Sequence, residues 1–221
     1  MARKILVSAG HSTVPPIDTG AVGNGYAEAD LTLELRDLVV GRLRSAGISP
    51  LVDGEDGRNE PLTKAILLAR QADLAVEIHF NADASPAASG TEALSKPDKR
   101  RAATLLAGAV ASAAGLPLRG SNGGWKATDS GHHKSLGFCN AGGMILEIAF
   151  ISSPSDMKAY QASKARVAQQ IADVLSHLAD AREPLAVDTA GQTRPTTSAR
   201  KRLGRGAIPV SGRTVRPSRT T

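Results

Sequence analysis

The stretch Leu74-Ala-Val-Glu-Ile-His-Phe80 decides the fold, because it is an apolar strand pattern that carries two ionisable side chains. Its length and its β-branched and aromatic residues are typical of a buried strand. A second stretch, Met144-Ile-Leu-Glu-Ile-Ala-Phe150, has the same character, with Glu147 at its centre. An unpaired carboxylate in so apolar a strand would be costly. We therefore expect Glu147 to have a function.

Working outward from these stretches, short apolar runs alternate with helical patterns over residues 1–182. This alternation predicts a layered α/β domain. Strands are expected at Lys4–Ser8, Ile48–Val52, Leu74–Phe80, Thr91–Leu94 and Gly143–Ile151. Helices are expected at Glu28–Ala46, Pro61–Gln71, Asp98–Ala114 and Ser163–Leu178, with loops at Ala9–Gly25 and Arg119–Asn140.

Polar side chains stand where the predicted strands and the first helix begin or end. His11 lies just after the first strand, Glu28 begins the first helix and His79 lies at the end of a strand. Sites in open α/β sheets gather beyond the carboxyl ends of the strands. Parallel strands would therefore bring His11, His79 and Glu147 together.

Two histidines and one carboxylate are the ligand set of a catalytic zinc site whose fourth position is open to water. A further carboxylate can take a proton from that water and pass it to a leaving nitrogen. Each residue taken alone also has a structural explanation. A histidine at a strand end is often only hydrogen-bonded, and a glutamate at a helix start interacts favourably with the helix dipole.

Four segments together resemble the zinc-dependent N-acetylmuramoyl-L-alanine amidases of the type 3 family. They are Ile5-Leu-Val-Ser-Ala-Gly-His11, Asp18-Thr-Gly-Ala21 followed by Glu28, Val76-Glu-Ile-His-Phe-Asn-Ala82, and Ile145-Leu-Glu-Ile-Ala-Phe-Ile-Ser152. The resemblance implies a mixed, mostly parallel twisted sheet flanked by helices, as in the amidase fold. It also implies zinc on His11, Glu28 and His79, with Glu147 as the catalytic glutamate.

Glu77 departs from the family, which usually has a small polar residue at this position. In an alternating strand Glu77 shares a face with His79 and could orient its ring by accepting a hydrogen bond from it. An ion pair between Glu77 and a neighbouring basic group is the alternative. The candidate substrate contacts are Asn81 and, in the glycine-rich loop, Trp125, Lys126, His132 and His133. A solvated loop is the alternative for the two histidines.

The net charge of +6 is confined to the C-terminal tail. Residues 183–221 carry eight basic and two acidic side chains, whereas residues 1–182 carry 19 of each sign. The tail has no aromatic residue and no apolar period, so we expect it to be a disordered, basic, Pro/Thr/Arg-rich extension. We expect it to contact anionic wall or outer-membrane polymers rather than a specific nucleic acid, or to have no dedicated partner.

Composition excludes several classes of protein. The single cysteine, Cys139, excludes an intramolecular disulfide framework and a zinc site built from several thiolates. No apolar run is long enough to span a membrane, and the N-terminal residues do not read as a signal peptide. We expect a monomer that is made in the cytoplasm.

The resemblance to the type 3 amidases implies a peptidoglycan hydrolase that cleaves between N-acetylmuramic acid and L-alanine with zinc-activated water and Glu147 as general base. A bacteriophage endolysin that a holin releases through the inner membrane is the expected biological role. The alternatives are a zinc peptidase that cuts the stem peptide and a non-catalytic cell-wall or nucleic-acid binding module.

Overall fold

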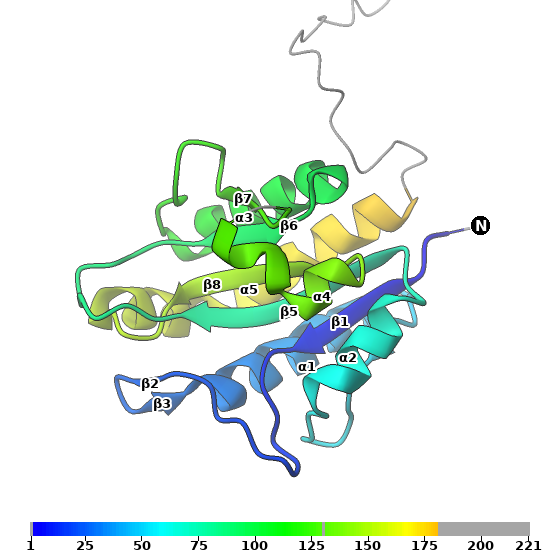
Figure 1. The fold of residues 1–221 in the computed structure, drawn as a ribbon, viewed down its shortest axis with the longest axis horizontal. Helices are drawn as coiled ribbons and strands as arrows, with labels where there is room; N and C mark the ends of the chain where they lie inside the picture. Colours follow the sequence, from blue (N-terminus) through cyan, green and yellow to red (C-terminus); the bar gives the residue numbers. More distant parts are fainter. Residues whose placement is uncertain (1, 130, 181–221) are drawn as a thin grey trace, which may run out of the picture. The chain divides into compact units, whose positions relative to one another are not determined.

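A computed structural model describes residues 2–129 and 131–180, without the side chain of His132. A six-stranded sheet forms its centre, with the strand order β4-β1-β5-β8-β6-β7 (Figure 1). The strands are β1 (Ile5–Ala9), β4 (Leu51–Val52), β5 (Leu74–Asn81), β6 (Glu92–Ser95), β7 (Trp125–Ala127) and β8 (Met144–Phe150). The predicted α/β class with a mixed, mostly parallel sheet is confirmed.

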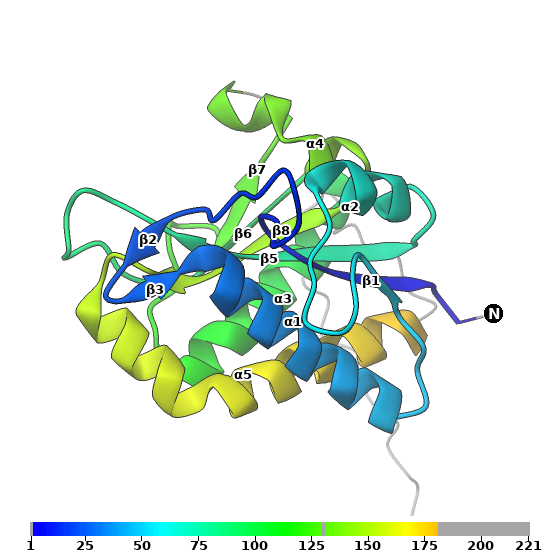
Figure 2. The ribbon, with the colours of Figure 1, turned by 90° about the horizontal axis from the view of Figure 1, so that it is seen from below.

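Helices cover both faces of this sheet (Figure 2). One face packs against α1 (Glu28–Ser45), α3 (Arg100–Ala114) and α5 (Pro154–Asp180). The other face packs against α2 (Leu62–Ala69) and the single turn α4 (Gly137–Asn140). Short 3₁₀ turns occur at Pro97–Lys99 and Gly131–Ser135. Both faces of the sheet are therefore buried, which explains why its central strands are apolar almost throughout.

Strand direction brings polar residues to one edge of the sheet. β1, β5 and β8 are parallel neighbours, and Glu147 on β8 is directly beside His79 on β5. β6 runs antiparallel to β8 and pairs Glu92 with Glu147. The carboxyl ends of three central strands and the amino end of β6 therefore meet at the same edge.

Three segments differ from the sequence-based expectation. α5 begins at Pro154 rather than Ser163, because Ser153 and Asp156 form an N-terminal cap in which the Asp156 N–H donates to Ser153 Oγ at 3.3 Å. The predicted loop Ala9–Gly25 contributes Val22–Gly23, the first strand of a small hairpin with Tyr26–Ala27. The predicted loop after Arg119 contains β7, which is held by pairing with β6 rather than by an apolar pattern of its own.

The edge strand β4 is also shorter than predicted, since only Leu51 and Val52 pair with β1. The basic tail, residues 183–221, lies outside the described residues, so its disorder and its partners stay predictions. Within the described part of the chain, no helix combines the length and hydrophobicity that a membrane crossing needs.

Cys139 lies in α4 and packs under the sheet face that α2 covers, where it is 1% exposed. Burial raises the pKa of its thiol to about 11. We therefore expect iodoacetamide at pH 8 to leave Cys139 unmodified in the native protein, because only the thiolate reacts and roughly one thiol in a thousand is ionised. Mass spectrometry after labelling checks this. The urea-unfolded protein is the control and should react completely; equal labelling rates in the two states would contradict the packing.

Candidate metal centre

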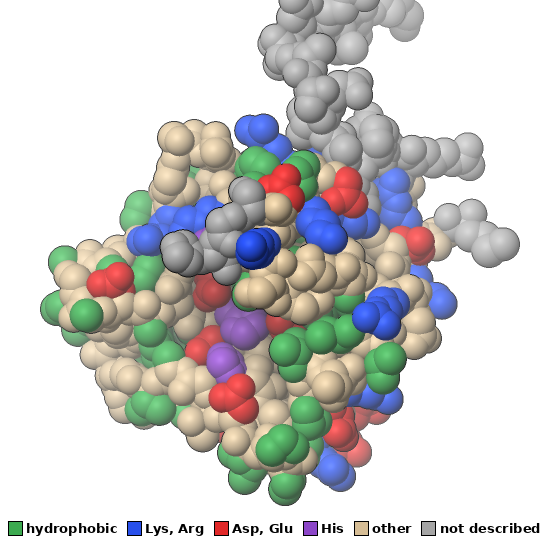
Figure 3. All heavy atoms as spheres, in the orientation of Figure 1, with side chains coloured by type: hydrophobic (Ala, Val, Ile, Leu, Met, Phe, Trp, Pro, Cys, Tyr) green, Lys and Arg blue, Asp and Glu red, His purple; other side chains and the backbone are tan. Residues whose placement is uncertain are grey.

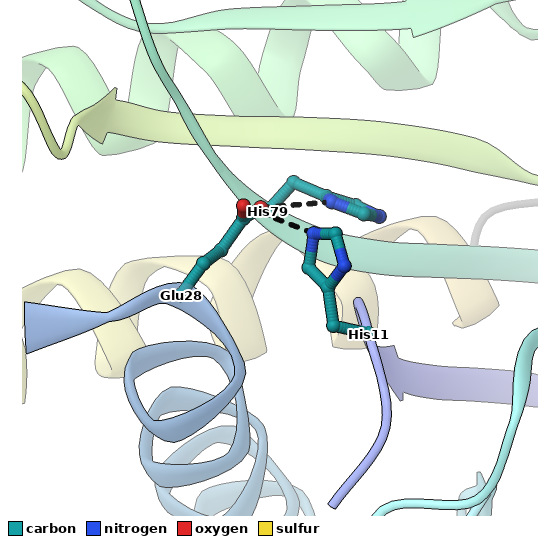
Figure 4. Close-up of side chains that lie close together, drawn as sticks. All are labelled: His11, Glu28 and His79. Carbon is teal, nitrogen blue, oxygen red and sulfur yellow. Dashed lines mark hydrogen bonds and ion pairs between the residues drawn. The ribbon is translucent and has the colours of Figure 1, made fainter. Parts of the chain in front are cut away.

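His11, Glu28 and His79 converge at the edge of the sheet, although they come from three separate elements (Figure 4). The two oxygens of the Glu28 carboxylate contact one histidine each. Oε2 lies 2.9 Å from Nε2 of His11, and Oε1 lies 3.0 Å from Nδ1 of His79. One potential ligand atom from each residue lies within 4.8 Å of the others. The arrangement offers a metal ion two imidazole nitrogens and a carboxylate oxygen.

The Glu28 carboxylate is buried, and backbone groups hold it in place. The Ala21 N–H donates to Oε2 at 2.9 Å and the Phe80 N–H donates to Oε1 at 3.0 Å. Burial alone would raise the pKa of Glu28, but the hydrogen bonds from both histidines outweigh burial and hold the pKa well below its usual range. The Glu28 carboxylate is therefore ionised and held in place, as a carboxylate that binds a metal must be.

Neighbouring carboxylates raise the pKa values of both histidines. Burial lowers the pKa of His11, yet the hydrogen bond and charge of Glu28 leave it raised above 6.5. Burial opposes protonation of His79 as well, but the bonds to Glu28 and Glu77 raise its pKa well above 6.5. Without a metal, the neighbouring carboxylates therefore favour the protonated form of both rings.

Each histidine also contacts a second carboxylate through its other ring nitrogen. Asp18 Oδ2 lies 3.0 Å from Nδ1 of His11, and Glu77 Oε2 lies 3.1 Å from Nε2 of His79. Metal-binding histidines typically have such partners, which fix the ring and increase its basicity. The residues present therefore fit a zinc ion. Glu77 contacts the His79 ring, the first of the two possibilities that the sequence left open, and its role in orienting that ring stays a prediction. The contact of Asp18 with His11 was not expected from the sequence, although Asp18 stands in the Asp-Thr-Gly-Ala turn.

The backbone comes unusually close to this group. A Cβ atom at Gly10 would overlap the imidazole of His79, and one at Gly20, whose φ is +64°, would lie 2.7 Å from Glu28 Oε2. His11 itself has a φ of 69°, which is strained for a residue other than glycine. Asn59 holds this strained turn, because its Nδ2 donates to the carbonyls of Ala9 and His11 at 2.7 and 2.6 Å.

Glu147 is beside the histidines but does not pair with them or with a basic group. Its Oε2 is buried and has no hydrogen-bond partner among the described residues. Burial raises the pKa of Glu147 to about 7; the charge of His79 opposes the shift, and the charges of Glu28 and Glu92 add to it. A carboxyl group with a pKa near neutrality can both accept and release a proton at physiological pH.

Two cavities meet at the group and share His79, Leu136 and Ile145 (Figure 3). The first, of about 290 Å³, contains His11 and Glu77 and has an apolar wall. The second, of about 380 Å³, contains Glu147. Figure 3 shows histidine and acidic side chains gathered in this hollow on the face of the molecule.

Three predicted substrate contacts, Asn81, Lys126 and His133, line the second cavity. Trp125 lines neither cavity: its indole N–H donates to Ser95 Oγ at 2.9 Å, and Arg100 lies over its ring. Its role as a substrate contact stays a prediction. The side chain of His132 lies outside the described residues.

Comparison with known proteins agrees with this geometry. A family model described as N-acetylmuramoyl-L-alanine amidase matches residues 5–177. The chain belongs to this family. The chain is therefore an N-acetylmuramoyl-L-alanine amidase, a hydrolase, and not a non-catalytic binding module. The family is zinc-dependent and implies peptidoglycan as the substrate, and His11, Glu28 and His79 could bind a metal.

Individual relatives are consistent with that membership. A structure from Neisseria meningitidis, assigned to the N-acetylmuramoyl-L-alanine amidases, is 37% identical to the amidase with a TM-score of 0.71, covering 79% of this chain and 94% of that one. The catalytic domain of CwlV from Paenibacillus polymyxa is 24% identical with a TM-score of 0.66, covering 79% and 97%. The uncharacterised Bacillus subtilis protein YqiI is 29% identical over 70% of this chain and 73% of its own length.

The close approach of Gly10 to His79 predicts the effect of a single methyl group. Gly10→Ala should displace the His79 ring and weaken zinc binding about 10-fold or more. The affinity can be measured by competition with a chromophoric chelator. Gly108→Ala, in α3, is the matched control because its added Cβ meets no atom within 4 Å. Equal zinc affinities for the two variants would contradict the assigned ligand.

The raised histidine pKa values predict that zinc binding releases protons. Zinc accepts only unprotonated imidazole nitrogens, whereas the raised pKa values of His11 and His79 favour protonated rings in the metal-free protein. The affinity for zinc should therefore fall as the pH is lowered from 8 to 6. Calorimetric titrations in buffers of different ionisation enthalpy measure the proton release; a binding enthalpy that is independent of the buffer would contradict it.

Proposed function

We propose that this amidase uses Glu147 as its proton-transferring group when it hydrolyses the bond between the lactyl carbonyl of N-acetylmuramic acid and the nitrogen of L-alanine. The observation that carries the proposal is the unpaired carboxyl of Glu147, with its pKa near 7, beside the His11–Glu28–His79 group. No other buried carboxylate in the described cavities is both free of a basic partner and adjacent to the candidate ligands.

The proposed roles follow from the positions of the side chains. Zinc held by His11, Glu28 and His79 would polarise the amide carbonyl and lower the pKa of water towards ~7. Glu147 accepts a proton from the attacking water. It then donates that proton to the nitrogen of L-alanine as the carbon–nitrogen bond breaks, so that the nitrogen leaves as a neutral amine. Asp18 and Glu77 hold the two histidine rings through their outer nitrogens.

Action as a phage endolysin, released to the wall after synthesis in the host cytoplasm, is the more specific part of the proposal. The catalytic domain of the CD27L endolysin has the same fold, with 19% identity and a TM-score of 0.59 over 79% of this chain and 97% of that one. Bacterial amidases share that fold too, so the endolysin role stays a prediction.

Analysis of the ends released from purified peptidoglycan tests the reaction. We expect new amino-terminal L-alanine, loss of activity with a chelator and recovery with zinc. Glu147→Gln should reduce turnover by about 10²–10⁴-fold while the zinc content remains unchanged.

Other outcomes would each change one part of the proposal. A new amino terminus on a different residue would indicate a peptidase that cuts the stem peptide. Loss of zinc from Glu147→Gln would make Glu147 a ligand. Full activity of that variant would remove Glu147 from the reaction.

A further inference from the structure

Two basic side chains line the cavity that contains Glu147, and both form an ion pair with the buried carboxylate of Glu92. Lys126 Nζ lies 2.9 Å from Glu92 Oε2 and 3.1 Å from Oε1, and Arg119 Nε lies 3.3 Å from Oε2. Glu92 is 1% exposed, and Asn81 Nδ2 also donates to its Oε1 at 2.9 Å. One negative charge is therefore shared by two positive charges, which leaves an excess positive charge at the cavity wall.

Both cations remain accessible to a ligand. The side chain of Lys126 is 42% exposed and that of Arg119 is 31% exposed, in contrast to the enclosed Glu92. Arg119 is also fixed in orientation, since its guanidinium lies 4.5 Å from the centre of the Phe150 ring and Nη1 donates to the Ser89 carbonyl at 3.3 Å. A preoriented guanidinium and a flexible ammonium are a suitable pair for a carboxylate.

Among the described residues, Glu92 is the carboxylate of this cavity that pairs with Lys126 and Arg119, and Asp83 and Glu147 form no ion pair with either of them. Glu92 is already paired, and the Asp83 carboxylate accepts the Ser85 N–H at 2.8 Å within its own turn. Among the residues that the structure describes, Glu147 Oε2 has no hydrogen-bond partner, whereas Lys126 and Arg119 pair with Glu92. The other cavity contains His11 and has Pro16, Leu62 and Phe138 in its wall, and the described residues that line it include no lysine or arginine. Lys126 and Arg119 thus lie at the Glu147 end of the hollow, and the other end has the apolar wall.

The proposed reaction decides which part of the substrate enters the basic end. Glu147 must reach the nitrogen of L-alanine to protonate it, so the peptide that continues from L-alanine lies on the Glu147 side. The muramic acid then lies towards the apolar cavity. This step rests on the proposed function, whereas the charge difference between the two cavities is independent of it.

We propose that Arg119 and Lys126 form a carboxylate-binding subsite for the stem peptide, selecting substrates whose second residue has a free α-carboxylate. In a stem peptide that residue is a D-glutamyl group linked through its γ-carboxyl. Its α-carboxylate is either free or amidated. It is one residue from the bond that is cut, and a residue spans about 3.5 Å of extended chain. The free form places a negative charge within reach of the two cations, and the amidated form does not.

A matched pair of substrates tests the subsite. Two disaccharide tripeptides are compared, in which the third residue is attached to the γ-carboxyl of D-glutamate. The α-carboxylate of that D-glutamate is free in one compound and amidated in the other. For the wild-type enzyme we expect kcat/KM to be about tenfold or more higher for the acid, mainly through a lower KM. Added sodium chloride should reduce this ratio, because salt screens an exposed ion pair.

A charge-removing variant assigns the preference to the cavity. Lys126→Gln should bring the ratio of the two kcat/KM values down to about threefold or less. Lys4→Gln removes the same charge from an exposed position at the opposite edge of the sheet, just before β1, and should keep the wild-type ratio.

Other results of these experiments would contradict either the subsite alone or the proposed reaction as well. A wild-type ratio of one, with both compounds cleaved, would overturn the subsite and leave the amidase reaction intact. An unchanged ratio in Lys126→Gln would also overturn it. Failure of the wild-type enzyme to cleave either compound would overturn the proposed reaction, and the subsite with it.

Discussion

The carboxylate of Glu28 is the group around which the site is organised. Four polar contacts converge on it, from the rings of His11 and His79 and from two backbone N–H groups. A buried carboxylate is costly unless it is paired and hydrogen-bonded. These contacts meet that requirement before any metal binds. They also demand that α1 begins at Glu28, beside the carboxyl ends of β1 and β5, and that glycine occupies positions 10 and 20.

A buried polar network supports the same group from inside the fold. Glu77, which contacts His79, lies 3.4 Å from Ser8 Oγ, and Ser8 Oγ donates to Asp53 Oδ2 at 2.5 Å. Asp53 in turn pairs at 3.1 Å with Arg36, whose side chain is fully buried in α1. The orientation of the His79 ring therefore depends on a network of polar and charged side chains that extends to Arg36 in α1. A buried hydrogen-bonded network of this kind helps to make a site rigid.

The antiparallel strand β6 gives the hollow its asymmetry. Because β6 runs against β8, its first residue, Glu92, lies beside Glu147 rather than at the far edge of the sheet. β7 pairs with β6 and brings Lys126 to the same place. Glu92 then binds the nearby cations and leaves the Glu147 carboxyl unpaired. If Glu147 were ion-paired with one of these cations, it would be a weaker base. The pairing of β6 with β8 therefore affects both the proposed proton transfer and the proposed recognition of the substrate.

Much of the fold and part of the site could be predicted from the sequence, because they depend on local patterns. The apolar runs of β1, β5 and β8 and the helical spacing in α1 and α3 reflect burial, which acts on each segment separately. The family segments around His11, Glu28, His79 and Glu147 are likewise contiguous stretches of sequence.

Only the tertiary structure decided which of the remaining polar residues meet. Asp18 has no pattern that marks it as the partner of His11, and Glu92 stands in a strand whose direction and neighbours follow from the packing of the whole sheet. The contacts of Arg119 and Lys126 with Glu92 join residues from different strands and loops. Hydrophobic periodicity determines which face of a segment is buried, but the choice between parallel and antiparallel pairing is made by the core as a whole.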